Sequence, residues 1–313
     1  MLKYRAAPAL ACLFFVACGR APAPAAPAAA DAAAAPASRA GPTAVRIANS
    51  ADGVPIAYRV YGHGDPAVVL IHGWACDSTY WHAQLADLAA KYTTVTLDLA
   101  GHGASGRNRT DWSMARFGQD VAAVVQQLAS ARVILVGHSM GGPVALEAAA
   151  ILGPRVIGIV GIDTFKSLGL PPPPRATVAQ AVAPFRADFT AEMHRFVPTL
   201  FEPHADAAIV RRVTDDMARE PPRIAIAALV SLNTMDYRTL LPRVRAPIVA
   251  IDSDLGYAES EARIRSVVPS FHLITMKGDG HFLMLEDPKH FNPILLREIE
   301  AMAQNARRSG RGG

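Results

Sequence analysis

The chain has 313 residues, of which 51% are hydrophobic and 19% charged, and its formal net charge is +4. This length and composition suffice for one large domain with a buried core. The positive charge is spread along the chain, which argues against a nucleic-acid partner, because such a partner requires a clustered basic patch. The ten histidines and three cysteines show no H-E-x-x-H or C-x-x-C spacing, so neither a metal nor another cofactor is expected.

The N-terminus is predicted to be an export signal. Lys3 and Arg5 form a positively charged start, and a mostly apolar run follows over residues 6–17. Twelve residues are too few to span a bilayer, and this pattern is typical of a signal peptide. The protein is therefore expected to be exported to the periplasmic side of a bacterial envelope.

The signal ends at Cys18, directly after small residues. This arrangement resembles the bacterial lipobox, in which the cysteine is lipid-modified and becomes the mature N-terminus. The resemblance implies lipidation of Cys18 and a membrane anchor, with the outer membrane favoured because Gly19 follows the cysteine. Phe15 stands where the lipobox usually has leucine, so a plain signal peptide and a secreted or periplasmic protein remain the alternative.

After Cys18 the chain is rich in alanine and proline up to residue 42, which predicts an extended tether rather than a helix. An antiparallel hairpin is then expected from the alternating patterns at 45–47 and 54–61. Short apolar runs, each a predicted strand, alternate with helical patterns from there on, which favours a mostly parallel sheet covered by helices. Strands are expected at 67–71, 92–98, 132–136, 156–162, 247–251 and 271–276, and helices near 79–90, 114–130, 140–152, 257–267 and 287–304.

Gly-His-Ser-Met-Gly at 137–141 lies between a predicted strand and a predicted helix. A G-x-S-x-G pentapeptide in this position is typical of a nucleophile elbow, a sharp strand-to-helix turn that exposes a serine. Its glycines let backbone segments pass closely on either side of the serine. Ser139 is therefore the candidate nucleophile.

Four motifs together resemble the α/β-hydrolase family, over about residues 44–304. They are H-G-W at 72–74, D-L-A-G-H-G-A-S at 98–105, G-H-S-M-G-G at 137–142 and G-H-F at 280–282. The resemblance implies a mostly parallel central sheet flanked by helices, with a helical cap inserted in the core. The motifs are specific for this fold and only weakly specific for the substrate.

Ser139 needs a general base and an acid that orients the base. The base is expected to be His281, which follows a predicted strand. The family commonly places the acid after the strand at 247–251, and Asp254 in that loop is favoured over Asp252 at the end of the strand. Asp163, after the preceding strand, is the runner-up, because some family members take their acid from that position.

The resemblance also implies two backbone N–H donors for the oxyanion, those of Trp74 and Met140. The expected function is a serine hydrolase that cleaves a small, mostly apolar carboxylic ester through an acyl-enzyme on Ser139. Hydrolysis of a C–C bond or an amide, or acyl transfer to another acceptor, remains an alternative on the same residues. A non-catalytic, ligand-binding envelope lipoprotein is a further alternative.

The alternation of strands and helices stops between 165 and 242, where Pro171 to Pro174 precede helical patterns with an aromatic-rich stripe. This insertion lies where α/β-hydrolases carry a cap, and most of the stripe is expected to form the core of the cap itself. The expected organisation is a signal peptide at 1–17, a tether at 18–42, a core at 43–164 and 243–305, a helical cap at 165–242 and a flexible basic tail at 306–313.

Overall fold

The structure is a computed structural model that describes residues 43–255 and 261–309. The predicted signal peptide, Cys18 and the tether up to residue 42 lie outside the described residues. Within the described part of the chain, no helix is both long enough and apolar enough to span a membrane.

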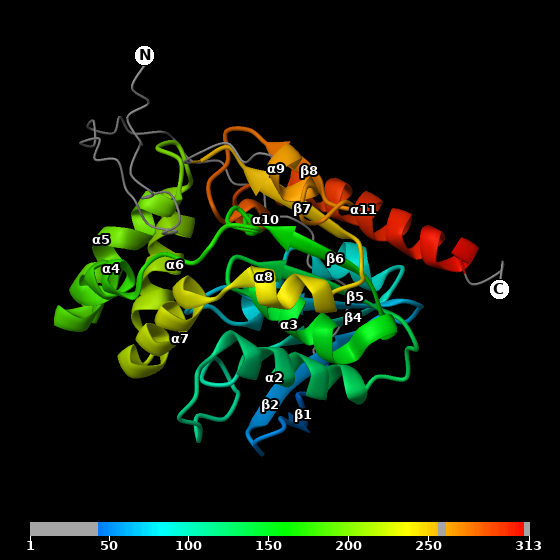
Figure 1. The fold of residues 1–313 in the computed structure, drawn as a ribbon, viewed down its shortest axis with the longest axis horizontal. Helices are drawn as coiled ribbons and strands as arrows, with labels where there is room; N and C mark the ends of the chain where they lie inside the picture. Colours follow the sequence, from blue (N-terminus) through cyan, green and yellow to red (C-terminus); the bar gives the residue numbers. More distant parts are fainter. Residues whose placement is uncertain (1–42, 256–260, 310–313) are drawn as a thin grey trace, which may run out of the picture.

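One eight-stranded sheet runs through the molecule in the order β1-β2-β4-β3-β5-β6-β7-β8 (Figure 1). Its pairs are antiparallel at β1/β2 and β2/β4 and parallel elsewhere. The α/β-hydrolase fold expected from the sequence is therefore confirmed. The strands are β1 (Arg46–Asn49), β2 (Pro55–Tyr61), β3 (Ala67–Ile71), β4 (Thr93–Leu97), β5 (Val133–His138), β6 (Val156–Ile162), β7 (Ile248–Ser253) and β8 (His272–Met276).

The burial of the strands follows their position in the sheet. Every residue of β3 and β5 is buried, because helices cover both faces of the sheet at its centre. The edge strand β1 buries only one of its four residues, and Ile47 is exposed. The apolar runs that predicted the strands are thus the runs that form the core.

Helices flank the sheet, with α2 and α3 on one side and α10 and α11 on the other (Figure 1). The helices of the core are α1 (Leu85–Ala89), α2 (Met114–Gln126), α3 (Gly141–Leu152), α8 (Tyr237–Leu240), α9 (Glu261–Arg265), α10 (Leu283–Glu286) and α11 (Pro288–Ser309). The helix expected at 79–90 is instead a 3-10 turn at Ser78–Trp81 followed by α1. The Asp77 side chain accepts the Thr79 N–H and starts this short turn separately.

Five α-helices lie between β6 and β7 in the sequence, and the first four of them lie beyond one end of the sheet in space (Figure 1). These four are α4 (Arg175–Ala187), α5 (Phe189–Phe196), α6 (Ala207–Ala218) and α7 (Pro222–Thr234), and we call them the cap helices. They lie inside the range predicted for the cap. The aromatic side chains of their stripe are buried, as expected for the core of such an insertion.

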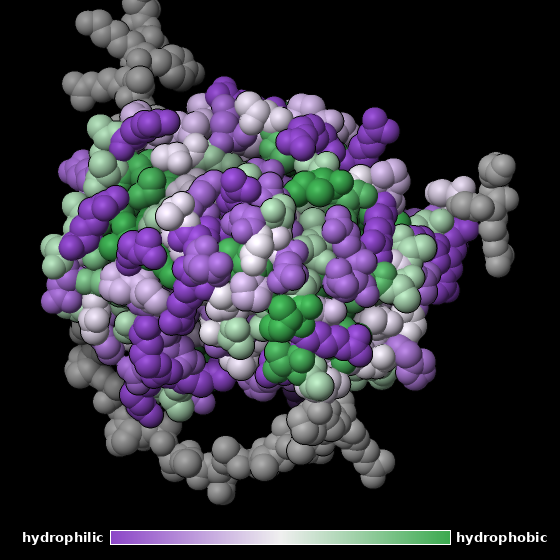
Figure 2. Space-filling model, turned by 90° about the horizontal axis from the view of Figure 1, so that it is seen from below, coloured by the Kyte–Doolittle hydropathy of each residue, from purple (hydrophilic) through white to green (hydrophobic). Residues whose placement is uncertain are grey.

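The face seen from below mixes polar and apolar side chains, with apolar groups in small separate patches (Figure 2). Large apolar side chains that are exposed among the described residues are few, namely Val45, Ile47, Ile151 and Val267. Scattered exposed apolar residues are normal on a folded protein and indicate no particular interface.

Candidate active site

Ser139 lies on a sharp turn between β5 and α3. Its φ of 50° is in the left-handed region, which a residue with a side chain rarely adopts. The turn is tight because a Cβ on Gly137 would lie 2.2 Å from the Gly141 carbonyl oxygen. A Cβ on Gly141 would lie 2.4 Å from the Ile71 carbonyl oxygen, so both glycines are required for this backbone path. The geometry is that of the predicted nucleophile elbow.

The sheet brings the ends of β5, β6 and β7 to one edge. His138 of β5 is in register with Ile162 of β6, and Ile162 with Ile251 of β7. The Ser139 N–H donates to the Ile162 carbonyl at 2.9 Å, and the Asp163 N–H donates to the Ile251 carbonyl at 3.0 Å. Ser139 and Asp163 therefore leave neighbouring strands at the same level, as expected for the carboxyl edge of a parallel sheet.

His281 reaches this edge from the loop after β8. Its N–H donates to the Leu200 carbonyl of the cap region at 2.7 Å. The Glu286 carboxylate accepts the N–H groups on either side of it, from Gly280 at 3.1 Å and from Phe282 at 3.0 Å. The backbone of His281 is thus fixed at three consecutive N–H groups.

The acid that holds the His281 ring is Asp163. His281 Nδ1 lies 2.5 Å from Asp163 Oδ2, and because a carboxylate only accepts, Nδ1 carries the proton. Asp163 Oδ1 accepts the N–H and the hydroxyl of Ser253, both at 3.0 Å, and forms an ion pair with Lys166 at 3.1 Å. Burial raises the pKa of Asp163, but the hydrogen bond and charge of His281 and the charge of Lys166 outweigh it and hold the pKa below its usual range.

The preference for Asp254 is therefore wrong, and Asp163 takes its place. Asp254 lies beyond the end of β7, where its N–H donates to the Met276 carbonyl and continues the pairing of β7 with β8. Its exposed side chain accepts the Gly278 N–H at 2.9 Å. Asp252 does not replace it either, because its Oδ1 accepts the Thr164 N–H at 3.2 Å.

Two further histidines lie close to the elbow as neutral, structural groups. His138 Nε2 donates to the His281 carbonyl at 2.9 Å, and burial lowers the pKa of His138 to about 3. His72 donates from Nδ1 to the Gly73 carbonyl at 2.8 Å and accepts the Leu99 N–H at Nε2 at 3.0 Å. Burial lowers the pKa of His72 as well, so neither ring competes with His281 for the role of base.

The two predicted oxyanion donors come from segments beside Ser139. Met140 immediately precedes α3, and N–H groups at the start of a helix have no acceptor within the helix. The loop that carries Trp74 follows β3, which pairs with β5. A Cβ on Gly73 would lie 3.4 Å from the Ser139 Cβ, so this loop lies against the elbow. The Trp74 and Met140 backbones are thus near the nucleophile, as expected.

The Trp74 side chain joins the core to the cap helices. Its Nε1 donates to the Ala225 carbonyl of α7 at 2.7 Å. Its ring meets Phe185 and Phe189 edge-on, at centroid distances of 5.6 and 6.4 Å. Phe282, next to His281, stacks on Phe201 of the cap region at 5.1 Å. Aromatic side chains from both the core and the cap therefore pack beside the loops that carry Trp74 and His281.

Sequence reasoning missed three residues that hold Asp163 and the His281 loop in place, namely Lys166, Ser253 and Glu286. Lys166 follows Asp163 by three residues and Ser253 follows Asp252, but neither position has a sequence pattern that specifies a contact with the acid. Glu286 follows His281 by five residues, a distance at which a short helix turns back toward its own start. That spacing was the only signal available for it.

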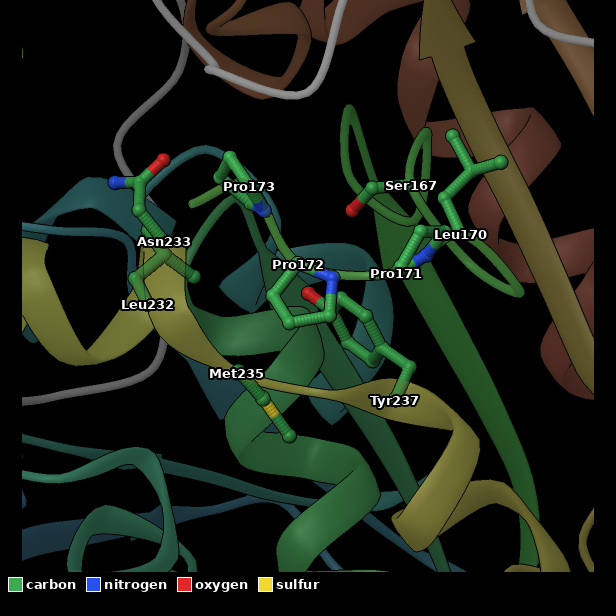
Figure 3. Close-up of a pocket in the computed structure, with 9 residues that line it drawn as sticks. All are labelled: Ser167, Leu170, Pro171, Pro172, Pro173, Leu232, Asn233, Met235 and Tyr237. Carbon is green, nitrogen blue, oxygen red and sulfur yellow. The ribbon is translucent and has the colours of Figure 1, made fainter. Parts of the chain in front are cut away.

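A separate small cavity lies where the chain enters and leaves the cap helices (Figure 3). Pro171 to Pro173 line one side of it, and Leu232, Met235 and Tyr237 line the other. Its volume of about 20 Å³ has room for a water molecule but not for a substrate. Ser139, Asp163 and His281 do not line it, so it is distinct from the candidate active site.

Comparison with known proteins agrees with this fold. Residues 68–291 match the model of a family described as the alpha/beta hydrolase family. The chain belongs to this family. It is thus a hydrolase by family. Separately, the described residues contain no group of three His, Cys, Asp or Glu side chains that could hold a metal ion.

An uncharacterized protein of Mycobacterium tuberculosis is 30% identical over 268 residues, which cover 78% of each chain. A pimeloyl-[acyl-carrier protein] methyl ester esterase of Yersinia pseudotuberculosis is 24% identical over 253 residues, covering 76% of this chain and 95% of that protein. The solved structure of a bromoperoxidase from Bacillus anthracis superposes with a TM-score of 0.73 at 23% identity, covering 82% of this chain and 100% of the other. At that identity the structural likeness supports the fold alone.

Proposed function

We propose that this hydrolase cleaves a small, mostly apolar carboxylic ester through an acyl-enzyme on Ser139. The observation that carries the proposal is the 2.5 Å contact between His281 Nδ1 and Asp163 Oδ2, formed at the sheet edge where Ser139 stands on its strained elbow. A serine, a histidine base and a buried carboxylate that orients the base are the parts of a nucleophilic triad.

The chemistry follows from the protonation of His281. With the proton held on Nδ1 by Asp163, Nε2 has a lone pair to accept the proton of the Ser139 hydroxyl. The alkoxide oxygen then bonds to the ester carbonyl carbon, and the N–H groups of Trp74 and Met140 stabilise the oxyanion. His281 returns the proton to the leaving alcohol, and water activated by the same ring releases the acid.

The preference for a small, apolar ester rests on the surroundings of the triad. Ser139 and His281 are each only 8% exposed. The aromatic side chains of the cap that cover Trp74 pack against one another and are themselves buried. Little surface remains for a long acyl chain, and apolar walls favour an apolar ester over a charged one. The methyl ester esterase of Yersinia pseudotuberculosis, one of the relatives, supports ester hydrolysis as the reaction class.

The experiment that tests the proposal is turnover of p-nitrophenyl esters of increasing chain length by the full chain. We expect turnover of the shortest esters, a decline as the acyl chain lengthens, and loss of turnover in Ser139→Ala. The matched control is Ser266→Ala, which removes the hydroxyl of an exposed serine and should retain native activity. Native activity in Ser139→Ala would refute the proposal.

Labelling by a fluorophosphonate separates two explanations if no ester is turned over. Labelling at Ser139 would show an active nucleophile and leave amide, C–C or acyl-transfer chemistry to be tested. A folded chain that remains unlabelled would indicate a binding protein and contradict the proposed triad.

We also propose that the protein acts on the periplasmic side of a bacterial envelope, anchored by a lipid on Cys18. The sequence at 1–18 supports this, and the alanine- and proline-rich tether up to residue 42 would place the hydrolase domain away from the membrane surface. Cys18→Ser should move the protein from the membrane pellet to the soluble fraction. Unchanged pelleting of that variant after an alkaline carbonate wash would refute the anchor.

A further inference from the structure

Lys166 places a positive charge on the far side of the carboxylate that holds His281. Its Nζ lies 3.1 Å from Asp163 Oδ1, whereas His281 binds the other oxygen, Oδ2. The side chains of Lys166 and Asp163 are only 11% and 5% exposed. Water therefore screens the interaction little, unlike that of an ion pair at the surface.

The backbone holds Lys166 in this position. Asp163 and Phe165 both have positive φ, at 43° and 70°, so the chain turns back on itself directly after β6. Arg263 of α9 donates to the Lys166 carbonyl at 2.7 Å and also to the Leu168 carbonyl. Lys166 Nζ itself donates to the Leu255 carbonyl at 3.4 Å. Hydrogen bonds thus hold both the backbone and the side chain of Lys166 in the loop that carries Asp163.

Other charged or titratable groups around the pair come from every neighbouring element. His138 of β5 is neutral, since burial lowers its pKa to about 3, and Asp252 of β7 binds the Thr164 N–H. Beside the Lys166 loop lies Arg263. The remaining groups lie around the His281 loop, and they are Asp254, Asp279, Glu286 and, from the cap region, Glu202 and His204. Among the lysines and arginines that the structure describes, Lys166 is the one paired with Asp163.

The charge balance of the buried pair then depends on Lys166. If Asp163 and His281 were alone, neutral His281 would leave one buried negative charge, and protonation of the ring would neutralise it. Burying an unpaired charge is costly, so such a pair favours the protonated, inactive base. With Lys166 present, Asp163 is already neutralised, and a further proton on His281 would add a net positive charge.

We propose that Lys166 is a positioning residue that acts through Asp163 to keep His281 unprotonated, and so keeps the enzyme active at lower pH than the Asp163–His281 pair alone would allow. The inference rests on the proposed serine-hydrolase function, because it requires His281 to be the base for Ser139.

The test measures how fast a fluorophosphonate labels Ser139 of the full chain at each pH between about 4 and 9. In this reaction the Ser139 oxygen bonds to phosphorus, fluoride leaves, and His281 takes the serine proton, so the rate reports the unprotonated base without a known substrate. The native chain is compared with Lys166→Met, which removes the charge, and Lys166→Arg, which keeps it. Lys289→Met removes the charge of an exposed lysine and serves as the matched control.

We expect the acid limb of the labelling profile to move up by about one pH unit in Lys166→Met. The shift is modest because the Lys166 charge acts on His281 through the Asp163 carboxylate that lies between them. Lys166→Arg and Lys289→Met should keep the native limb. Lys166→Gln retains an N–H donor for Asp163 and loses only the charge, so its limb should move with that of Lys166→Met. This second variant also keeps the test open if Lys166→Met does not fold.

An unmoved acid limb in folded Lys166→Met or Lys166→Gln would overturn the inference while leaving Ser139 as the nucleophile. An equal shift in Lys166→Arg would also overturn it, because the charge would then not be the cause. Absence of labelling in the native chain at every pH would instead refute the proposed function itself.

Discussion

Replacement of Asp163 by asparagine tests the assignment of the acid most directly. The carboxylate has two unlike sides. Oδ1 accepts hydrogen bonds from the N–H and the hydroxyl of Ser253 and pairs with the Lys166 ammonium group. Oδ2 accepts the hydrogen bond from His281 Nδ1. An asparagine amide has one oxygen and one NH₂ group, so only one side can accept. The three donors around Oδ1 would hold the amide oxygen there and turn the NH₂ group toward His281.

In that orientation the ring must accept at Nδ1 and carry its proton on Nε2. Nε2 is the atom that has to accept the Ser139 proton, so the variant would hold His281 in the wrong tautomer. The same change in the triad of a serine protease lowers kcat by about 10⁴-fold, with the geometry intact. We expect a loss of that order in Asp163→Asn, equivalent to about 5.4 kcal/mol at about 1.36 kcal/mol for each factor of ten.

The assay is kcat for a short-chain p-nitrophenyl ester, measured with Asp163→Asn, Asp254→Asn and Asp252→Asn in parallel. Asp254→Asn should retain activity close to native, because its side chain only accepts the Gly278 N–H at the exposed end of β7. Thermal melting of each variant checks that it is folded. A larger loss in folded Asp254→Asn than in folded Asp163→Asn would refute this reasoning.

Three other predictions concern stability and the cap. Burial raises the pKa of Glu286 from its ordinary value of 4.5 to about 7. Its contribution to stability is therefore complete below pH 4.5 and lost as the pH rises through about 7, and urea denaturation of Glu286→Gln should show a flatter dependence across that window. Arg109 Nη2 and Asp120 Oδ1 form a buried ion pair at 2.6 Å. Arg109→Met removes the positive partner of this buried carboxylate and should lower the free energy of unfolding by about 3–5 kcal/mol in the same assay, with recovery in Arg109→Met/Asp120→Leu. Trp74→Phe removes the hydrogen bond to Ala225 and should expose the core–cap contact, seen as faster hydrogen exchange in α7 with the sheet unchanged.

The parts of the fold that could be predicted from the sequence are those determined locally. Val133 to Val136 form an apolar run bounded by a glycine motif, and that pattern alone predicts a buried strand followed by a sharp turn. The turn at Ser139 therefore has the geometry predicted for it, and the α/β-hydrolase fold is confirmed. The helix expected at 79–90 was wrong because one residue, Asp77, caps a short turn whose end no periodicity marks.

The acid could not be chosen from the sequence because Asp254, Asp163 and Asp252 all satisfy the chain order of serine, acid and histidine. Asp163 and Asp254 each follow a strand that ends at the same edge of the sheet. Each is the first residue after its strand, and what separates them is the direction that the backbone takes there. Asp163 turns at once, with a positive φ, whereas the Asp254 N–H still pairs with β8 and carries its side chain past the site.

The same reasoning explains why supporting residues are harder to predict than the triad. A triad residue performs chemistry that few residue types allow, so its identity is itself a signal. Lys166 and Glu286 act only through where they lie, one on the far oxygen of Asp163 and the other on the two N–H groups that flank His281. A lysine three residues after an acid, or a glutamate in a short helix, is usually a solvated side chain. Lys166 and Glu286 affect the site because they are largely buried against it, and their burial depends on the packing of the whole sheet edge.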